Sequence, residues 1–381
     1  MRIALYYPWV YLRSGVERMM LELVSRSRHD WTIFTSHYYP EQTYPEFKQL
    51  DIKELSRVPV NRDYSAVGKA AVSIFRQKIK LTDFDAMVVS SEGLGDFITF
   101  RNNDIPVICY CHTPLKVIHD PFTRSHYLRI NPGKKLPFIL FSEAFKLFDR
   151  RAWKHYRYVF CNSREVRQRI IKAGLAPPER IEVLSPGLDT NYISPSWEYQ
   201  KYFVVAGRIK WWKNLELAIA SFLEFKQNYP EFADFRLHIT GLVEAGSEEY
   251  FVKLRQLAGE RSDIIFKRDP NEAELMANYR SGYCLLCPSL NEDWGMTLLE
   301  AMGFGKPVIA VNQGGPAESV RDGETGFLVE PQPRAFAEAM ARLARDPGLT
   351  RRLGEAGVEQ VKKYDWKIFV ARFDEYLDTL N

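Results

Sequence analysis

The feature that most constrains this chain is a regular alternation of short apolar runs with amphipathic segments, which begins at its second residue. Residues 2–7 form an apolar run, and the segment after it repeats its apolar positions at helical spacing: Val16, Met19, Met20, Leu23 and Val24. Strand and helix signals in alternation are typical of βα units around a parallel sheet. We therefore predict a doubly wound α/β domain with further strands near residues 31–36, 84–90, 105–111, 158–162 and 181–184.

A second α/β domain is predicted from the same pattern, which restarts at residue 202. Its strands are expected near 202–206, 235–240, 264–267, 283–288, 307–311 and 327–329, with helices near 215–228, 248–259, 272–281, 297–304 and 315–321. A stretch with proline and glycine at residues 186–196 has the composition of a linker. The 381 residues suit about two domains, so we expect domains at 1–188 and 189–364 and an amphipathic helix at 365–381.

Charge is unevenly divided between the two halves of the chain. Residues 1–190 contain 29 Lys and Arg against 20 Asp and Glu, whereas residues 191–381 contain 23 against 28. A basic first half indicates an anionic partner, which could be a phosphorylated acceptor, a membrane surface or nucleic acid. The alternative is a surface whose charges are merely unevenly distributed.

Cysteine usage and the start of the chain predict a cytoplasmic protein. The five cysteines form no disulfide framework, and no signal peptide precedes the strand at residues 2–7. Cys284 and Cys287 have the spacing of half a zinc site, but they lie on a predicted strand without a second pair, which favours buried structural thiols. No run of 18 apolar residues indicates a transmembrane helix. The glycine fingerprint of dinucleotide-binding folds and the P-loop are both absent, which disfavours those classes.

The stretch at residues 291–303 joins a buried strand to a helix through Gly295. Parallel α/β sheets bind ligands beyond the carboxyl ends of their strands, where the next helix presents unpaired N–H groups. Glu292 in the loop and Glu300 in the first helical turn can then face one ligand. The alternative for Glu300 needs no ligand, because Thr297-x-x-Glu300 also matches a capping box.

Three other predicted loops carry candidate residues. His112 follows the strand at 105–111, at the carboxyl end where ligands bind. The alternative interpretation is that it is a histidine packed within a loop. Gly15 begins a helix, either for close approach of a phosphate or for turn geometry alone. Arg208 and Lys213 bracket a strand-to-helix loop, where cations suit a pyrophosphate, unless they are solvated loop charges.

Two further short motifs carry less weight. Asp83-Phe84-Asp85 has the D-x-D pattern that holds a divalent cation in some sugar-transferring folds. It lies at the entry of a strand, opposite the end where ligands bind, so we expect no metal there. Gly314-Gly315 precedes a helix and could approach a ligand, although glycine pairs are common in such turns.

Taken in order, these segments resemble the retaining glycosyltransferases of family 4. The resemblance covers nearly the whole chain and depends on three motifs together: G-R-x(4)-K at residues 207–213, E-x(7)-E at 292–300, and G-F-G-K-P-V-I-A at 303–310. It implies the GT-B fold, with two Rossmann-like domains facing each other across a cleft. The second domain would hold most of the donor, and the last helix would cross back to the first domain.

The resemblance also implies roles for residues of the second domain. Arg208 and Lys213 would bind the donor pyrophosphate in place of a metal ion. Glu300 would accept hydrogen bonds from the ribose hydroxyls, and Glu292 from hydroxyls of the transferred sugar. Backbone N–H groups near three residues would hold sugar and phosphate: Met296, Thr297 and Leu298.

The remaining implied contacts involve both ends of the donor. His112 would contact the sugar, and the Gly15 loop would approach phosphate, although this loop has one glycine where the family often has two. Lys267 and Arg268 end a strand near the expected base, and they do not indicate whether the base is uracil or guanine.

The implied function is retaining, metal-independent transfer of a hexose in polysaccharide biosynthesis. The donor would be a nucleotide-sugar such as UDP-glucose or GDP-mannose, and the acceptor a glycan or a lipid-linked molecule, with no cofactor and no nucleic acid partner. Two fixed cations beside a helix N-terminus suit the charge that develops on a leaving diphosphate. A nucleotide-sugar epimerase and a non-catalytic nucleotide-sugar binder are the alternatives. A glycosidase with Glu292 and Glu300 as its carboxylates is disfavoured, because hydrolysis of a neutral sugar needs no anion clamp.

A basic and aromatic segment at residues 134–157 indicates contact with an anionic membrane. Interleaved bases and large apolar residues can dock at the headgroup level, which would place this cytoplasmic protein at the inner face of a membrane. The alternative is that one helical face of the segment packs into the core of the first domain: Phe141, Phe145, Phe148 and Ala152.

Overall fold

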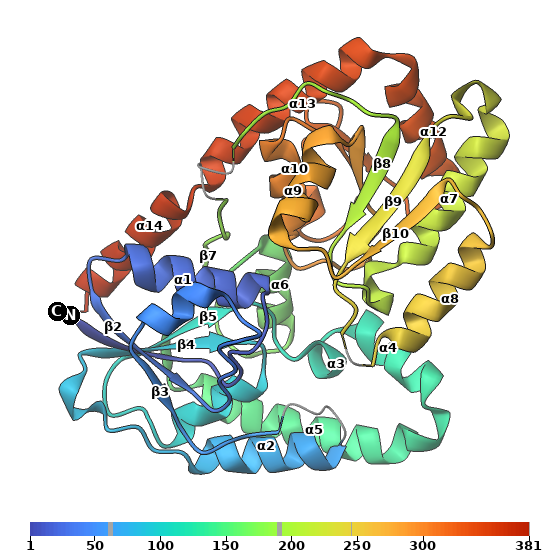
Figure 1. The fold of residues 1–381 in the computed structure, drawn as a ribbon. Helices are drawn as coiled ribbons and strands as arrows, with labels where there is room; N and C mark the ends of the chain where they lie inside the picture. Colours follow the sequence, from blue (N-terminus) through green and yellow to red (C-terminus); the bar gives the residue numbers. More distant parts are fainter. Residues whose placement is uncertain (60–63, 189–192, 245, 381) are drawn as a thin grey trace. The chain divides into compact units, whose positions relative to one another are not determined.

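The computed structural model of the protein describes residues 1–59, 64–188, 193–244 and 246–380 (Figure 1). The chain divides into two compact units. The first unit consists of Met1–Pro186 and Trp366–Asn381, and the second of Gly187–Asp365. Part of the predicted linker, residues 189–192, lies outside the described residues.

The first unit is built on a seven-stranded parallel sheet in the order β3-β2-β1-β4-β5-β6-β7. Its strands are β1 (Arg2–Tyr6), β2 (Asp30–Thr35), β3 (Ile52–Glu54), β4 (Ala86–Ser91), β5 (Val107–Cys111), β6 (Tyr156–Cys161) and β7 (Ile181–Val183). The strand order reverses between β1 and β4, which is where doubly wound sheets form their ligand crevice. The edge strand β3 is not predicted from the sequence, because it has only three residues and none of them is buried.

Helices cover both faces of this sheet (Figure 1). They are α1 (Gly15–Arg26), α2 (Tyr64–Arg76), α3 (Lys116–His119), α4 (Pro121–Ile130), α5 (Lys135–Trp153), α6 (Arg164–Lys172) and α14 (Trp366–Asp378), with the 3₁₀ helix η3 (Leu94–Phe100). Burial of the strands on both faces explains why β1, β4 and β5 read as continuous apolar runs rather than as alternating patterns.

The C-terminal helix α14 belongs to the first unit. Its buried residues recur at helical spacing: Trp366, Phe369, Val370, Phe373 and Leu377. The Phe373 ring contacts the rings of Trp31 and Phe160. The buried Asp374 carboxylate accepts a hydrogen bond from Ser27 Oγ at 2.6 Å. Apolar packing and a buried hydrogen bond therefore join the last helix to elements more than 200 residues earlier.

The second unit is built on a six-stranded parallel sheet in the order β10-β9-β8-β11-β12-β13. Its strands are β8 (Tyr202–Ala206), β9 (Arg236–Gly241), β10 (Ile264–Arg268), β11 (Cys284–Cys287), β12 (Val308–Val311) and β13 (Gly326–Val329). Its helices are α7 (Leu215–Asn228), α8 (Glu248–Ala258), α9 (Glu272–Ser281), α10 (Met296–Gly303), α11 (Pro316–Ser319), α12 (Pro333–Arg345) and α13 (Pro347–Val361). The strand order reverses between β8 and β11, and the loops after these two strands carry the predicted donor residues. Helices α12 and α13 are absent from the sequence-based prediction.

The residues of the two weak metal motifs have structural contacts. The Asp85 carboxylate accepts a hydrogen bond from the backbone N–H of Arg2 at 2.7 Å, where β1 begins. The thiols of Cys284 and Cys287 are free and buried in the second unit. Among the described residues, no group of three or more His, Cys, Asp and Glu side chains is placed to hold a metal ion.

Within the described parts of the chain, no helix combines the length and the hydropathy needed to span a bilayer.

Candidate active site

A single glycine shapes the loop between β11 and α10. Gly295 has a left-handed backbone (φ +93°), and a Cβ there would lie 2.3 Å from Leu298 Cδ1, so only glycine fits. Helix α10 begins directly after it, and the first N–H groups of a helix have no partner within it. The N–H groups of Met296 and Thr297 thus belong to the open end of α10. The N–H of Leu298, the third predicted group, instead donates to the Gly295 carbonyl at 3.1 Å.

The capping-box interpretation of Glu300 is wrong. Gly295 is the N-cap and forms no side-chain cap, so Thr297 lies inside the helix rather than before it. Glu300 Oε2 accepts a hydrogen bond of 2.8 Å from Tyr279 Oη, on α9. Burial and the neighbouring Glu300 hold the pKa of Tyr279 well above its usual range, so its hydroxyl stays a donor. The Tyr279 ring stacks against Phe304, and this packing holds the Tyr279 hydroxyl beside the Glu300 carboxylate.

The backbone of the glycine pair Gly314-Gly315 packs directly against the backbone of the Glu292 loop. A Cβ on Gly314, which has φ +61°, would lie 2.3 Å from the carbonyl oxygen of Glu292. A Cβ on Gly315 would lie 2.4 Å from Trp294 Cα, and the Gly315 N–H donates to the Glu292 carbonyl at 2.9 Å. Close approach of two backbones accounts for both glycines.

The loop after β8 brings basic residues together on one carboxylate. Arg208 Nη1 lies 3.6 Å from Glu244 Oε1, and Lys210 Nζ lies 3.1 Å from Glu244 Oε2. Both cations also lie 5.9 Å from the ring centroid of Trp212, within the range of a cation–π contact. Lys210 and Glu244 are not predicted from the sequence, because their pairing depends on the packing of the β8 and β9 loops.

Lys213 and Glu292, 79 residues apart in the chain, form an ion pair. Lys213 Nζ lies 2.5 Å from Glu292 Oε2, and each side chain is only 17% exposed. Lys213 is placed by Asn214, whose left-handed backbone (φ 51°) starts α7 and whose side chain donates to the Pro288 carbonyl at 3.2 Å. The two strand-end loops of the second unit are thereby joined by a hydrogen bond and a largely buried ion pair.

A small cavity of about 10 Å³ lies where these loops meet. It is lined by Val205, Ala206, Arg208, Lys213, Leu215, Leu286, Cys287, Pro288, Ser289 and Thr297. A cavity of this size has room for about one water molecule. The structure therefore brings Arg208, Lys213 and Thr297 of the predicted site around one point at the N-terminal end of α10.

Arg268 lies apart from this cluster, at the end of β10. Its guanidinium is exposed and forms ion pairs with Glu248 on α8 and with Asp269. Its neighbour Lys267 donates to Asn278 Oδ1 at 3.3 Å. Neither residue lines the small cavity.

His112 and Gly15 belong to the first unit. The His112 side chain is buried, and its Nε2 lies 2.9 Å from Ser90 Oγ, while its ring contacts Tyr110 edge to face. Gly15 is exposed and opens α1, directly after its N-cap Ser14.

Two family models match this chain. The model described as Glycosyltransferase Family 4 matches residues 13–192, and the model described as Glycosyl transferases group 1 matches residues 193–360. The chain belongs to the family 4, group 1 glycosyltransferases.

Similar proteins agree with this assignment. The alpha-1,3/1,6-mannosyltransferase ALG2 of Mus musculus is 26% identical to this glycosyltransferase, over 96% of this chain and 94% of its own. The D-inositol 3-phosphate glycosyltransferase of Acidothermus cellulolyticus is 31% identical over 53% of this chain and 48% of its own. Sucrose-phosphate synthase from Thermosynechococcus elongatus has a TM-score of 0.77 at 18% identity and covers 100% of this chain and 99% of its own. Anabaena HepE in complex with UDP-glucose has a TM-score of 0.72 at 18% identity, with both chains covered completely. These likenesses confirm the predicted GT-B fold.

A buried carboxyl group that the sequence analysis missed supports the Gly15 loop of this glycosyltransferase. Glu17 on α1 accepts hydrogen bonds from Ser14 Oγ and from the backbone N–H of Leu12, the latter at 3.1 Å. Burial raises the pKa of Glu17 to about 7. Near neutral pH this carboxyl is therefore partly protonated, which lowers the negative charge behind a loop expected to approach phosphate.

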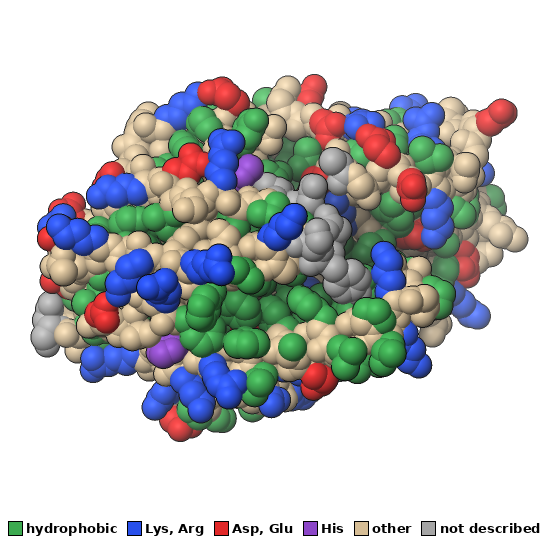
Figure 2. All heavy atoms as spheres, turned by 90° about the horizontal axis from the view of Figure 1, so that it is seen from below, with side chains coloured by type: hydrophobic (Ala, Val, Ile, Leu, Met, Phe, Trp, Pro, Cys, Tyr) green, Lys and Arg blue, Asp and Glu red, His purple; other side chains and the backbone are tan. Residues whose placement is uncertain are grey.

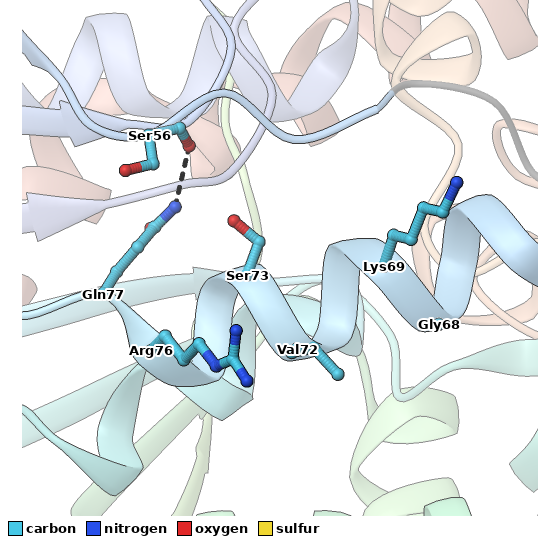
Figure 3. A pocket seen from close by; sticks show the side chains of 7 residues that line it. All are labelled: Ser56, Gly68, Lys69, Val72, Ser73, Arg76 and Gln77. Carbon is cyan, nitrogen blue, oxygen red and sulfur yellow. Dashed lines mark hydrogen bonds between the residues drawn. The ribbon is translucent and has the colours of Figure 1, made fainter.

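A wider pocket of about 520 Å³ lies elsewhere, along α2 in the first unit (Figure 3). Its lining residues are Ser56, Gly68, Lys69, Val72, Ser73, Arg76 and Gln77. The Gln77 side chain donates to the Ser56 carbonyl at 2.8 Å (Figure 3). None of the predicted site residues of the glycosyltransferase lines it, and its size gives no reason to place the chemistry there.

Proposed function

We propose that this glycosyltransferase moves a hexose, with retention and without a metal ion, from a nucleotide-sugar to a glycan or lipid-linked acceptor. The observation that carries the proposal is the convergence of Arg208, Lys213 and the start of α10 on one small cavity. Two cations and the positive end of a helix form an anion site, as a diphosphate requires. The reaction loads negative charge on the leaving diphosphate, and preorganised cations stabilise it without reorganising.

Glu292 would exchange partners when the donor binds. In the structure its carboxylate pairs with Lys213 Nζ at 2.5 Å. A diphosphate is a stronger partner for the ammonium group than one carboxylate, so the donor would take Lys213 and leave Glu292 to accept hydrogen bonds from sugar hydroxyls. The adjacency of the two side chains supports both roles at one site.

Glu300 would hold the ribose of the donor. It lies one helical turn beyond the open N–H groups of α10, and Tyr279 fixes its carboxylate through a 2.8 Å hydrogen bond. An ionised carboxylate has about four acceptor sites, so Glu300 can accept from Tyr279 and from a ribose hydroxyl at the same time. This geometry supports a nucleoside beside the diphosphate and disfavours a glycosidase, which would use both glutamates on one glycosidic bond.

The transfer step would proceed on the face of the sugar that carries the leaving group. The bond between the anomeric carbon and the diphosphate oxygen breaks, and the acceptor oxygen forms the new bond on the same face. The acceptor proton passes to the departing phosphate oxygen, which has become the stronger base. Arg208 and Lys213 stabilise that oxygen until the proton arrives.

The donor would carry either mannose or glucose. A mannosyl donor is supported by the relative named as a mannosyltransferase, which aligns over 94% of its own length. A glucosyl donor is supported by the complex of a similar fold with UDP-glucose. Because that structure shares only the fold with this chain, we favour a GDP-mannose-like donor.

Metal independence and donor choice can be tested with the whole protein. A thermal-shift screen of GDP, UDP and ADP should reveal one stabilising nucleotide, since a ligand at 100 times its dissociation constant stabilises by about 2.7 kcal/mol. Transfer from the matching nucleotide-sugar should persist in EDTA. Loss of turnover in EDTA with recovery on adding Mn²⁺ or Mg²⁺ would refute metal independence. Turnover of donor without acceptor would indicate an epimerase, and binding without turnover a non-catalytic binder.

A further inference from the structure

Helix α5 has two faces of different character. Its inner face is buried against the first unit: Phe138, Ser142, Phe145, Asp149 and Ala152. Its outer face exposes large apolar side chains: Leu136 (67% exposed), Leu140 (65%), Leu147 (53%) and Phe148 (49%). Of the four residues in the core-packing alternative, Phe145 and Ala152 are buried and Phe141 packs against the core, so the expectation is wrong for Phe148 alone. The apolar core stripe runs through Phe138, Phe145 and Ala152, which turns Phe148 away from the interior.

Basic side chains accompany this outer face. At helical spacing, Arg151 and Lys154 continue the row formed by Leu136, Leu140 and Leu147. Lys134 and Lys135 are exposed where the helix begins. Residues 124–157 contain nine Lys and Arg against two Asp and Glu. Asp149 is buried, and Glu143, which lies in the row between Leu140 and Leu147, is exposed and pairs with Lys146 at 2.8 Å. Figure 2 shows the corresponding side of the molecule, where hydrophobic side chains form a broad area bordered mainly by Lys and Arg.

We propose that the outer face of α5 docks on a bilayer that contains anionic lipids. The face is defined by Leu136, Leu140, Leu147 and Phe148 together with Lys134, Lys135, Arg151 and Lys154. Its apolar side chains would enter the headgroup region, and its bases would pair with lipid phosphates. The proposal rests on the proposed function in one respect, because a docked first unit would meet a lipid-linked acceptor.

Charge favours a bilayer over a second copy of this chain. Two copies joined through this face would bring the same bases together, and like charges oppose such an interface. An anionic bilayer instead offers many phosphates at once, and each basic residue near it contributes on the order of 1 kcal/mol, or about five-fold in binding.

The contacts beneath α5 keep it folded on the protein while its outer face is in lipid. Asp149 Oδ2 lies 2.7 Å from His119 Nε2, and both side chains are almost fully buried. Trp153 Nε1 donates to the buried Asp96 at 3.1 Å. Because the helix is already formed and fixed from within, docking needs no folding step and loses little conformational entropy.

Co-sedimentation with vesicles tests the proposal on the full-length protein. We expect binding to phosphatidylcholine vesicles that contain phosphatidylglycerol, no binding to pure phosphatidylcholine, and release at high salt because exposed charges are screened. Arg151→Glu with Lys154→Glu should weaken binding at least about ten-fold. Leu140→Gln with Leu147→Gln should also weaken it. The matched control is Val252→Gln with Leu257→Gln on α8, where the two side chains are 50% and 47% exposed; it should bind like the parent protein.

Each other outcome contradicts docking. Equal binding to neutral vesicles, or no binding to either kind, would overturn the proposal. A concentration-dependent dimer that the α5 variants abolish would assign the face to self-association, and binding to a soluble acidic protein without vesicle binding would assign it to a protein partner. Nucleotide thermal shifts measured on the same variants separate the two proposals. Normal shifts with no vesicle binding refute docking alone, whereas absent shifts in the parent protein refute the proposed donor site.

Discussion

At the scale of residues, the cations of the site are held by carboxylates of the same unit. Lys213 pairs with Glu292, and Arg208 and Lys210 flank Glu244. Arg208, Lys213 and Glu292 could be predicted from the sequence, because each belongs to a motif whose spacing is set within one loop. The counter-charge of Glu244 could not, since it depends on how the β8 and β9 loops pack.

In the proposed donor site, Tyr279 would position the carboxylate of Glu300 through their hydrogen bond. Glu300→Gln should lower the affinity for the matching nucleoside diphosphate about ten-fold or more, because a charge-assisted hydrogen bond contributes about 1.5–3 kcal/mol. Tyr279→Phe should lower it by a smaller factor, since the carboxylate remains but is less well oriented. Titration calorimetry measures both effects.

The control for these variants is the same nucleotide without its ribose hydroxyls. Both variants should bind the deoxy nucleotide as the parent protein does, because the lost contact is already absent. An equal loss of affinity for both nucleotides would mean that the two residues only support the fold.

At the scale of elements, most strands and helices follow from apolar periodicity, and the errors have physical causes. The capping-box interpretation places the N-cap of α10 at Thr297, two residues after the observed N-cap, because Gly295 in a left-handed conformation opens the helix without a side-chain cap. The role of Gly314-Gly315 was not readable, because the backbone that they accommodate is about 20 residues away in the chain. For α5, the apolar periodicity predicted that one helical face is buried, but it did not predict which residues bound that face.

The packing of α5 also predicts a pH dependence of stability. Burial raises the pKa of Asp96 to about 8, with the nearby Asp149 acting in the same direction. An unfolded Asp titrates near 4. The proton is therefore held more tightly in the folded state, so this contribution to stability is complete below about pH 4 and is lost as pH rises through about 8.

Asp96→Asn tests this prediction. The amide can replace the protonated carboxyl, accepting from Trp153 and donating to the Tyr156 hydroxyl, which contact the two oxygens of Asp96. Between pH 5 and 8, the free energy of unfolding should fall with rising pH more steeply in the parent protein than in the variant, by up to about 1.4 kcal/mol per pH unit. Denaturant unfolding at several pH values measures both slopes. Identical slopes in variant and parent would show that Asp96 is ionised in the folded protein throughout this range.

At the scale of the whole molecule, the alternation of strands and helices predicts two doubly wound units, and the family models and similar structures confirm this fold. Motif order identifies the family because the three motifs lie at fixed places in one fold. The identities of the donor base, the sugar and the acceptor could not be predicted from the sequence, since they depend on side chains outside the motifs. The proposed function depends on Arg208 and Lys213 holding the donor diphosphate.

Two ligands that differ only in their phosphates test the role of Arg208 and Lys213 directly. Titration calorimetry should be performed with the matching nucleoside diphosphate and with its nucleoside, on the parent protein, Arg208→Ala, Lys213→Ala and the surface control Lys253→Ala. We predict that the first two variants lose about ten-fold or more in affinity for the diphosphate, the scale of a charge-assisted contact, and bind the nucleoside like the parent. The control should bind both ligands normally. Folded Arg208→Ala and Lys213→Ala proteins with parent-like affinity for the diphosphate would contradict the account.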